Sequence, residues 1–292
     1  MSASIVALGH VGIRKEESFA SGGEPTDYQP IFSEDIRMEK HYDYSDRIMN
    51  TSQQVGGRLL NVGITGSITF PISPDGPEMW WNCGLGQTSS VYSEERPLDS
   101  MVITLDREAG DIYTSGDMIS SLEISSAAGA PLQCVASIEG KGYSDYTAST
   151  PSYTSGDDGF LHNEGKFYVA GAEILNVMTF SVSINNNLVT DLYTNQKERR
   201  DIPATKCMVT GNMTLLFEDT TQRNRFMTEE SVKLEAIYAR GANSFTVTLD
   251  KVRFDDDSQP LSGQTDYIAE TINFTAYVDD PSTEESIQIT VV

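Results

Sequence analysis

The chain has 292 residues, enough for one large hydrophobic core or two of ordinary size, and the usual size of a domain favours two. It carries 20 Lys and Arg against 43 Asp and Glu, which gives a formal net charge of −23 at pH 7. Binding nucleic acid through its phosphates requires clustered Lys and Arg, so this balance argues against a nucleic-acid-binding protein. Two interpretations of the acidity stay open: it keeps the protein soluble, or it forms a surface that repels a polyanion.

The cysteines and the N-terminus indicate a reduced protein without a membrane segment. Cys83, Cys134 and Cys207 are too few and too scattered for a disulfide framework or a Cys-x-x-Cys metal site, and we expect small buried hydrophobes or free thiols. The first ten residues lack the basic segment of a signal peptide, and no run approaches the ~20 apolar residues of a membrane span. We therefore expect synthesis in a cytoplasm and no contact with membranes.

The first 60 residues resemble an irregular arm with one short strand over 31–38, because Gly and Pro interrupt them and apolar anchors are few. A strand over 62–70 and a short helix over 78–83 follow. The helix contains Trp80 and Trp81. Adjacent aromatic residues on a helix point in different directions, so we expect one in the core and one at an interface.

The next segment has strands over 101–105, 118–126 and 132–138, and the last two alternate as a hairpin with one buried face. Residues 140–159 are rich in Ser, Thr, Gly, Tyr and Asp, and we place the domain junction there. The prediction is an arm and first domain over 1–160 and a second domain over 161–292.

The second half repeats this organisation. Residues 174–184 alternate as a half-buried strand, and a strand over 206–217 leads into a short helix that reaches 225–227. A mostly antiparallel set completes the chain, with strands over 232–239, 244–254, 267–277 and 286–292.

Two stretches share a fingerprint. Residues 64–70 (ITGSITF) and 209–217 (VTGNMTLLF) are in register when Gly66 is placed on Gly211, an offset of 145 residues (211 − 66). The same offset places Trp81 on Phe226 (226 − 81). A spacing of half the chain indicates a duplicated domain, although Thr, Gly and β-branched residues also recur by chance in strands.

No familiar catalytic pattern is present in the sequence. His10, His41 and His162 are far apart and outside any metalloprotease motif, and we assign His41 to the surface. The nucleophile elbow, the phosphate loop and the dinucleotide fingerprint are missing. We therefore predict no catalytic residues, no cofactor and no enzymatic activity.

Three charged segments are interpreted as solvated. The aspartates at 157–158 and 255–257 could attract Ca²⁺, but they lack the spacing and central Gly of an EF-hand loop. Residues 197–200 (KERR) are interpreted as a solvated loop that pairs with acidic neighbours. We therefore predict no metal site.

Several blocks of the chain resemble the tail tube proteins of long-tailed bacteriophages. The resemblance covers residues 60–292 in pieces, and its specificity comes from the order of strand and turn patterns. The blocks are 113–125, 128–132, 135–140, 180–188, 209–214, 217–219 and 267–276.

The resemblance implies a mainly β fold of β-sandwich-like domains, each with one short helix, whose strands join a barrel between subunits. This chain departs from the smallest members of the family by carrying two such domains in tandem. It implies a virion structural protein that assembles into stacked rings and forms the conduit for DNA ejection. Three chains per ring with pseudo-sixfold symmetry are favoured, with six chains as the alternative. The implied partners are tail terminator, tape measure and distal tail proteins, and DNA passes without specific binding.

This interpretation gives further expectations. Asp and Glu should dominate the lumen, because a negative wall repels phosphate. The arm over 1–60 and the segment 140–165 are the candidates for contacts between rings. A different class of function is a carbohydrate-binding or adhesin-like β-sandwich, with Trp80, Trp81 and the Tyr-rich junction as its platform. An enzyme ranks third, since no set of residues in catalytic roles is found.

Overall fold

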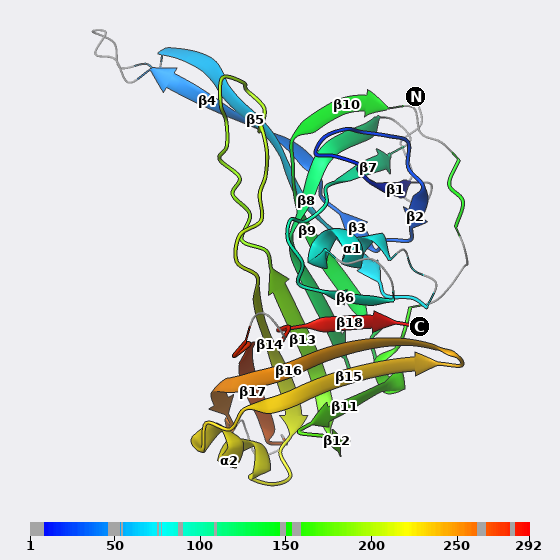
Figure 1. Ribbon diagram of the computed structural model, residues 1–292, viewed down its shortest axis with the longest axis vertical. Helices are drawn as coiled ribbons and strands as arrows, with labels where there is room; N and C mark the ends of the chain where they lie inside the picture. Colours follow the sequence, from blue (N-terminus) through cyan, green and yellow to red (C-terminus); the bar gives the residue numbers. More distant parts are fainter. Residues whose placement is uncertain are drawn as a thin grey trace.

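The computed structural model describes residues 9–45, 53, 55–74, 76, 78–86, 90–107, 110–146, 150–153, 159–261, 267–280 and 284–292. In this part the chain is mainly β, with two α-helices of seven residues each (Figure 1). The helices are α1 (Met79–Leu85) and α2 (Thr221–Met227). The strands are β1 (His10–Lys15), β2 (Asp27–Gln29), β3 (Ser33–Glu34), β4 (Arg37–Ser45), β5 (Val55–Pro71), β6 (Val91–Ser93), β7 (Met101–Asp106), β8 (Asp111–Ala127), β9 (Gln133–Gly140), β10 (Gly142–Tyr146), β11 (Gly165–Val169), β12 (Ala172–Ile174), β13 (Val177–Asn185), β14 (Met208–Leu216), β15 (Val232–Arg240), β16 (Asn243–Ser258), β17 (Ala269–Ala276) and β18 (Gln288–Val291).

The strands form two sets with the same antiparallel pairings. In the first set β5 lies between β4 and β9, and β8 pairs with β9, β7 and β10. In the second set β14 lies between β13 and β17, and β16 pairs with β17, β15 and β18. The hairpin of β1 and β2 pairs with β7, as the hairpin of β11 and β12 pairs with β15. We call residues 10–146 module 1 and residues 165–291 module 2.

The two modules also share their β-bulges. The pairing of β8 with β9 skips Ser120, and the pairing of β16 with β17 skips Asp255, 135 residues later (255 − 120). A second bulge interrupts β7 with β8, and another interrupts β15 with β16. Bulges re-aim a strand at one defined residue, so their coincidence means that the modules match in register as well as in strand order.

The repeated Thr-Gly of the sequence lies at equivalent positions in β5 and β14. A Cβ atom on Gly66 would lie 2.5 Å from the Cα atom of Ile36, and one on Gly211 would lie 2.4 Å from the Phe274 ring and the Ser181 carbonyl oxygen. Neither position has room for a side chain. Close approach of neighbouring groups therefore explains why both strands keep glycine here.

A strand pairing joins the two modules. β13 of module 2 pairs with β8 of module 1, from Thr179 opposite Ala127 to Asn185 opposite Ser121. One buried cluster draws apolar side chains from both modules. The boundary between residues 160 and 161 therefore remains a prediction, since the core does not divide there.

Helix α1 lies at this joint, packed on β8 (Figure 1). Its Trp81 ring is 5.2 Å from the ring of Phe245 in module 2. The side-chain amide of Asn186, which follows β13, donates to the carbonyl oxygens of Gly84 and Ile119. Trp80 stacks on Phe70 and is also buried. Trp80 thus lies in the core of module 1 and Trp81 at the contact between the modules, which agrees with the expectation of one tryptophan in the core and one at an interface.

The N-terminal region departs most from the prediction. It contains β1 to β4 and the start of β5, and β1 is buried against β7, about 90 residues away. The predicted strand over 31–38 is split into β3 and β4, and β4 forms with β5 a hairpin that projects from the body (Figure 1). The description as an irregular arm is wrong because its stabilising partners are distant in sequence, beyond what a local pattern reports.

The predicted junction also contains structure. β10 continues the hairpin of β8 and β9, so residues 142–146 belong to module 1. The other predicted strands are present with boundaries that shift by a few residues, and both short helices follow the repeated strands as expected.

Candidate functional site

One side of the central sheet is polar. In β9 every second side chain enters the core and the alternate ones lie on the opposite face, and the neighbouring strands continue this alternation. We call this opposite face the polar face. Its polar side chains on six neighbouring strands include Thr65, Ser67 and Thr69 of β5, Gln133, Ser137 and Glu139 of β9, Ser121, Glu123 and Ser125 of β8, Thr179, Ser181, Ser183 and Asn185 of β13, Thr210, Asn212 and Thr214 of β14, and Thr271, Asn273 and Thr275 of β17. Apolar side chains on the same face include Val135 of β9 and, at the strand ends, Ala127, Met208, Leu216 and Ala269.

The polar face is composed mainly of hydroxyl and amide groups. Among these described positions there is no Lys or Arg, and the carboxylates are Glu123 and Glu139. Acidic residues do not dominate this face. A face of this kind hydrates well but offers no cation to a phosphate.

A loop from module 2 covers part of this face. Arg199, in the connection between β13 and β14, is buried, with a guanidinium nitrogen 2.7 Å from a carboxylate oxygen of Glu139. The guanidinium also donates to the carbonyl oxygens of Ile64 and Gly140. The expected pairing of this loop with an acidic neighbour is present, but the interpretation of 197–200 as solvated is wrong for Arg199, whose side chain is buried. The side chains of the positions around it are exposed, and the loop backbone also contacts module 1, since the Lys197 carbonyl oxygen accepts the Val62 N–H.

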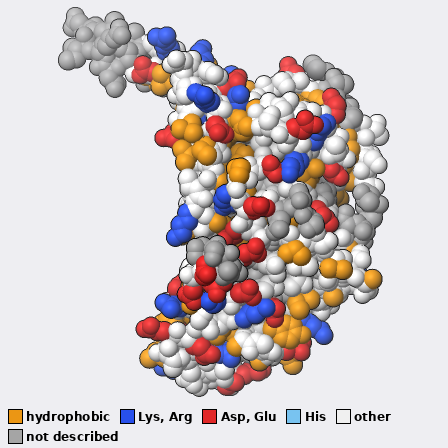
Figure 2. All heavy atoms as spheres, in the orientation of Figure 1, with side chains coloured by type: hydrophobic (Ala, Val, Ile, Leu, Met, Phe, Trp, Pro, Cys, Tyr) orange, Lys and Arg blue, Asp and Glu red, His pale blue; other side chains and the backbone are white. Residues whose placement is uncertain are grey.

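The outline of the molecule is concave on the side of this loop. Figure 2 shows the hollow between the projecting β4–β5 hairpin at the top and the α2 end at the bottom. In Figure 1 the loop between β13 and β14 rises on that side, whereas α1, β1 and β7 lie on the other side of the sheet. The polar face therefore belongs to the inner side of a curved sheet.

The sheet ends in two unpaired edges. Among the described residues, no strand pairs with the outer edge of β3 and β4, which contact β5 on their other side. The same is true of residues 253–258 of β16 on the edge away from β17. The two edges lie at opposite ends of the molecule (Figure 1).

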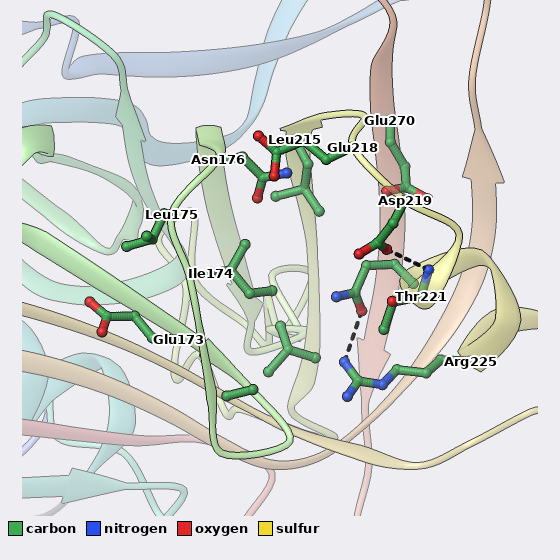
Figure 3. Close-up of a pocket in the computed structure, with 13 residues that line it drawn as sticks. Glu173, Ile174, Leu175, Asn176, Leu215, Glu218, Asp219, Thr221, Arg225 and Glu270 are labelled. Atoms are coloured by element: carbon green, nitrogen blue, oxygen red, sulfur yellow. Dashed lines mark hydrogen bonds between the residues drawn. The ribbon is translucent and has the colours of Figure 1, made fainter.

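A groove of about 340 Å³ lies beside α2 (Figure 3). Glu173, Glu218, Asp219 and Glu270 line it, with Arg225 as the one cation among the described lining residues. Burial, and the charge of Asp257 next, raise the pKa of Glu270 to about 7. No aromatic side chain lines the groove, so it lacks the flat apolar surface on which a sugar ring stacks.

The platform expected for a carbohydrate-binding protein is not assembled. Trp80 and Trp81 are buried under module 2 and the N-terminal strands. Of the junction tyrosines, Tyr146 donates its hydroxyl to Glu24, and Tyr153 lies against Tyr28. These rings are engaged separately and do not share a surface with the tryptophans.

The three histidines stay apart. His10 contacts Asp106, His41 is exposed as expected, and the ring of His162 lies between Ser126 and the carbonyl oxygen of Val177. Within the described residues, no three His, Cys, Asp or Glu side chains group as metal ligands.

Among the described residues, the cysteines and the aspartate runs do not form a metal site either. Cys83 and Cys134 are buried and Cys207 is half-buried, all as free thiols. Burial raises the pKa of Cys83 to about 12, so it stays a protonated thiol. The aspartates at 255–257 form the end of β16 rather than a turn, and those at 157–158 lie outside the described residues.

Sequence reasoning missed a buried carboxyl group in module 1. Asp117 is fully buried at a bulge of β8 and accepts a hydrogen bond from Thr114, and burial raises its pKa to about 8. In module 2 the equivalent positions hold Val252 and Leu249. Nothing in the local pattern marks Asp117, which sits at the start of an alternating strand. Because Asp117 is buried at a bulge and bonded to Thr114, we assign it a structural role; it does not lie on the polar face.

A family model described as phage tail tube protein matches residues 7–276, which is nearly the whole chain. No curated protein matches the sequence. In the described part of the chain, neither helix has the length and apolar character to cross a membrane. The resemblance in the strand and turn blocks is confirmed, and the chain belongs to the phage tail tube protein family.

Proposed function

We propose that three copies of this chain close into a ring of six modules, and that rings stack into a tail tube through which DNA leaves the virion. The polar face lines the channel. The observation that carries this proposal is a curved sheet whose inner face presents no Lys or Arg at the described positions of its six central strands, β5, β9, β8, β13, β14 and β17. On the flanking strands, Arg37 of β4 and Arg253 of β16 share this face. The chain acts as a structural subunit without catalysis.

The chemistry of that wall suits the passage of DNA. Phosphate contacts by Lys and Arg support non-specific binding at ~10⁻⁴ to 10⁻⁶ M, about 5.5 to 8 kcal/mol per site. Rows of such sites would hold a moving genome. Hydroxyl and amide groups supply no such attraction, and Glu123 adds weak repulsion. The wall we propose is neutral to weakly acidic, since Arg199 offsets Glu139.

Ring closure follows from the duplicated architecture. Unpaired strand edges invite uncontrolled association, and joining them in a closed barrel removes the hazard. Three chains with two modules each place six equivalent modules around the axis. Six chains would leave one module of every chain outside that symmetry. An obligate interface above ~2,000 Å² is expected between neighbours.

Contacts between rings are assigned to the β4–β5 hairpin. It projects beyond the body, and Tyr42, Tyr44 and Leu60 on it are each about half exposed (Figure 1). The segment 140–165 is a second candidate. Tail terminator, tape measure and distal tail proteins would contact the ends and the interior of the finished tube.

Electron microscopy of the concentrated protein tests assembly. We expect rings or tubes with a bore and three chains per ring. Isolated particles without a bore would overturn the proposal.

A charge variant tests the channel lining. Ser183→Lys on the polar face should make assembled tubes retain double-stranded DNA at low salt, with retention lost as salt is raised. The matched control is Ala242→Lys in the exposed turn between β15 and β16. Equal retention by both variants would contradict the assignment of the polar face to the lumen.

A further inference from the structure

The strand pairing that joins the two modules has equivalent strands at the two ends of the molecule, and there the strand edges are unpaired among the described residues. At the joint, β13 pairs with β8 along residues 121–127. The strands equivalent to β13 and β8 in the other module are β3–β4 and β16, and these carry the two unpaired edges. The chain thus contains one completed joint and both halves of a second one.

We infer that β3–β4 of a second copy of this chain pairs antiparallel with the β16 edge, reproducing the β8–β13 joint between subunits. This inference rests on the proposed ring and names the edges that close it. The inferred pairing has one defined register. Non-specific association of strand edges would not favour any single register.

The register of β4 follows from its partner β5. Thr65 and Thr210 are the repeated residues of the two modules. Thr65 pairs with Arg37, and Thr210 pairs with Ser183, so Arg37 is equivalent to Ser183. By the same step Glu39 is equivalent to Asn185, two residues further along both strands.

The register of β16 follows from the shared bulge. Ser120 and Asp255 are the skipped residues, so Ser121 corresponds to Asp256. At the internal joint Asn185 lies opposite Ser121. Glu39 of one copy should therefore lie opposite Asp256 of the next.

The same rule gives the neighbouring pairs. Ser183 lies opposite Glu123 at the internal joint, and the position equivalent to Glu123 is Ser258 (123 + 135). Arg37 should therefore face Ser258, and Met38 should face Asp257.

The backbone of β4 is oriented for this pairing. The Asp35 N–H donates to the Ser67 carbonyl oxygen of β5, and in an antiparallel strand the direction alternates. Met38 therefore points its N–H and C=O outward. At Ile36 the outward groups are occupied, since Glu34 accepts the N–H and Arg107 donates to the C=O. The new joint should begin at Met38 and continue toward Lys40.

The side chains at the two edges are complementary in net charge, although Glu39 opposite Asp256 is an unfavourable like-charge pair. Arg37 and Lys40 are exposed on β4, and Asp255 and Asp256 are exposed on β16. In the inferred register Arg37 is diagonal to Asp256 on one face, and the Lys40 N–H replaces the bond that the Asn186 N–H makes to the Ser120 carbonyl oxygen. The second copy brings cations to an edge that carries three consecutive carboxylates.

Cysteine pairs test the register directly. Positions 37 with 258 and 39 with 256 are non-hydrogen-bonded pairs, with Cα atoms ~4.5 Å apart, within disulfide reach. We would assemble Arg37→Cys/Ser258→Cys and Glu39→Cys/Asp256→Cys under reducing conditions, oxidise them, and analyse them on denaturing gels. The crossed pairs, Arg37→Cys/Asp256→Cys and Glu39→Cys/Ser258→Cys, use the same four substitutions at ~7 to 8 Å and serve as matched controls.

The in-register pairs should give a ladder of linked chains that ends at three, while the crossed pairs and each single variant stay mostly unlinked. A ladder that ends at six would support the joint and overturn the three-chain ring. Preferential linking of the crossed pairs would overturn the register. If wild-type rings form but no pair links, the joint is wrong while the proposed function stands. If no rings form, both fail.

A backbone variant gives a second readout. Met38→Pro removes the outward N–H that the joint uses, a change that an edge strand tolerates. We expect a folded chain by circular dichroism that no longer forms rings. Met38→Ala keeps the N–H and should keep the rings. Rings formed equally well by Met38→Pro would overturn the joint.

Discussion

Helices α1 and α2 follow equivalent strands and pack on equivalent strands, β8 and β16, yet their surroundings differ. In α1 five residues are buried, Trp80, Trp81, Cys83, Gly84 and Leu85. In α2 none is buried, and Met227 is 69 % exposed. α1 is covered by β1 and β6 of its own module and also by module 2, through Phe245 and Asn186. No third module in the chain covers α2, so its exposure indicates the place where a neighbouring copy would lie.

The interiors of the two modules also differ, in how polar their buried side chains are. Module 1 keeps a buried polar pair, Thr114 with Asp117, where module 2 has Leu249 and Val252. Near that pair, buried Glu16 accepts hydrogen bonds from Ser100 and from the backbone. Polar groups thus tie the N-terminal strands into module 1, and module 2 relies on apolar packing at the equivalent place.

The largest expected effect comes from truncating the two equivalent helix aromatics. Trp81→Ala should lower the free energy of unfolding of the isolated chain by about 4 kcal/mol, because it empties a buried contact between the modules. Phe226→Ala in α2 should cost less than half of this, since its side chain is only partly buried. Equilibrium denaturation in urea measures both.

The matched control is the conservative pair of substitutions. Trp81→Phe and Phe226→Leu keep most of the apolar volume and should each restore much of the loss. An equal loss for the two alanine variants in the monomer would show that α2 is already covered within one chain. It would remove the contrast between the helices.

The duplication was accessible from the sequence because its signal is local. The Thr-Gly pairs at 65–66 and 210–211 recur where a Cβ would collide with a neighbour, and each repeated strand is followed by a short helix. The burial of Trp81 was not accessible in this way. Its cover, Phe245, is 164 residues away (245 − 81), and no periodicity of the helix reports it.

The next effect concerns the loop that ties module 2 to module 1. Arg199→Ala removes the ion-pair partner of Glu139 and the side-chain donor to two buried carbonyl oxygens, and should lower the free energy of unfolding by about 3 kcal/mol. Arg200→Ala, at the exposed neighbouring position, should change it by no more than about 0.5 kcal/mol. Thermal and urea unfolding of the three proteins measure this difference, and similar stabilities for both variants would contradict a structural role of Arg199.

Composition explains why this arginine was misassigned. Within KERR at 197–200, three residues are exposed and one is buried, and alternation of charge along a loop does not distinguish them. The polar face was missed for a related reason. Its Ser, Thr and Asn side chains come from six strands distributed over both halves, so only the pairing of those strands gathers them into one surface.

A smaller effect is the pH dependence that Asp117 gives module 1, in addition to that of Glu270, whose pKa is also raised, in module 2. Burial raises the pKa of Asp117 to about 8, so the folded chain retains a proton that the unfolded chain releases above about pH 4. The stabilising contribution is present at low pH and is lost as pH rises from about 4 to 8, by at most ~1.4 kcal/mol per pH unit. Asp117→Asn should flatten this slope. Parallel profiles of stability against pH for the variant and the wild type would show that Asp117 does not titrate in this window.

The smallest effect on the monomer is expected at Met227 of α2. Met227→Ala should leave the free energy of unfolding within about 0.5 kcal/mol, because the side chain is mostly in solvent. If a second copy covers α2 as module 2 covers α1, Met227→Asp should shorten or abolish tubes, since it places a charge in an apolar contact next to an already acidic edge. The control is Ala242→Asp, at an exposed residue of the turn between β15 and β16, away from the inferred joint. Sedimentation of assembled protein measures the outcome. Tubes of unchanged length for Met227→Asp would mean that α2 stays exposed in the assembled tube. The two helices would then be equivalent in fold position but not in burial.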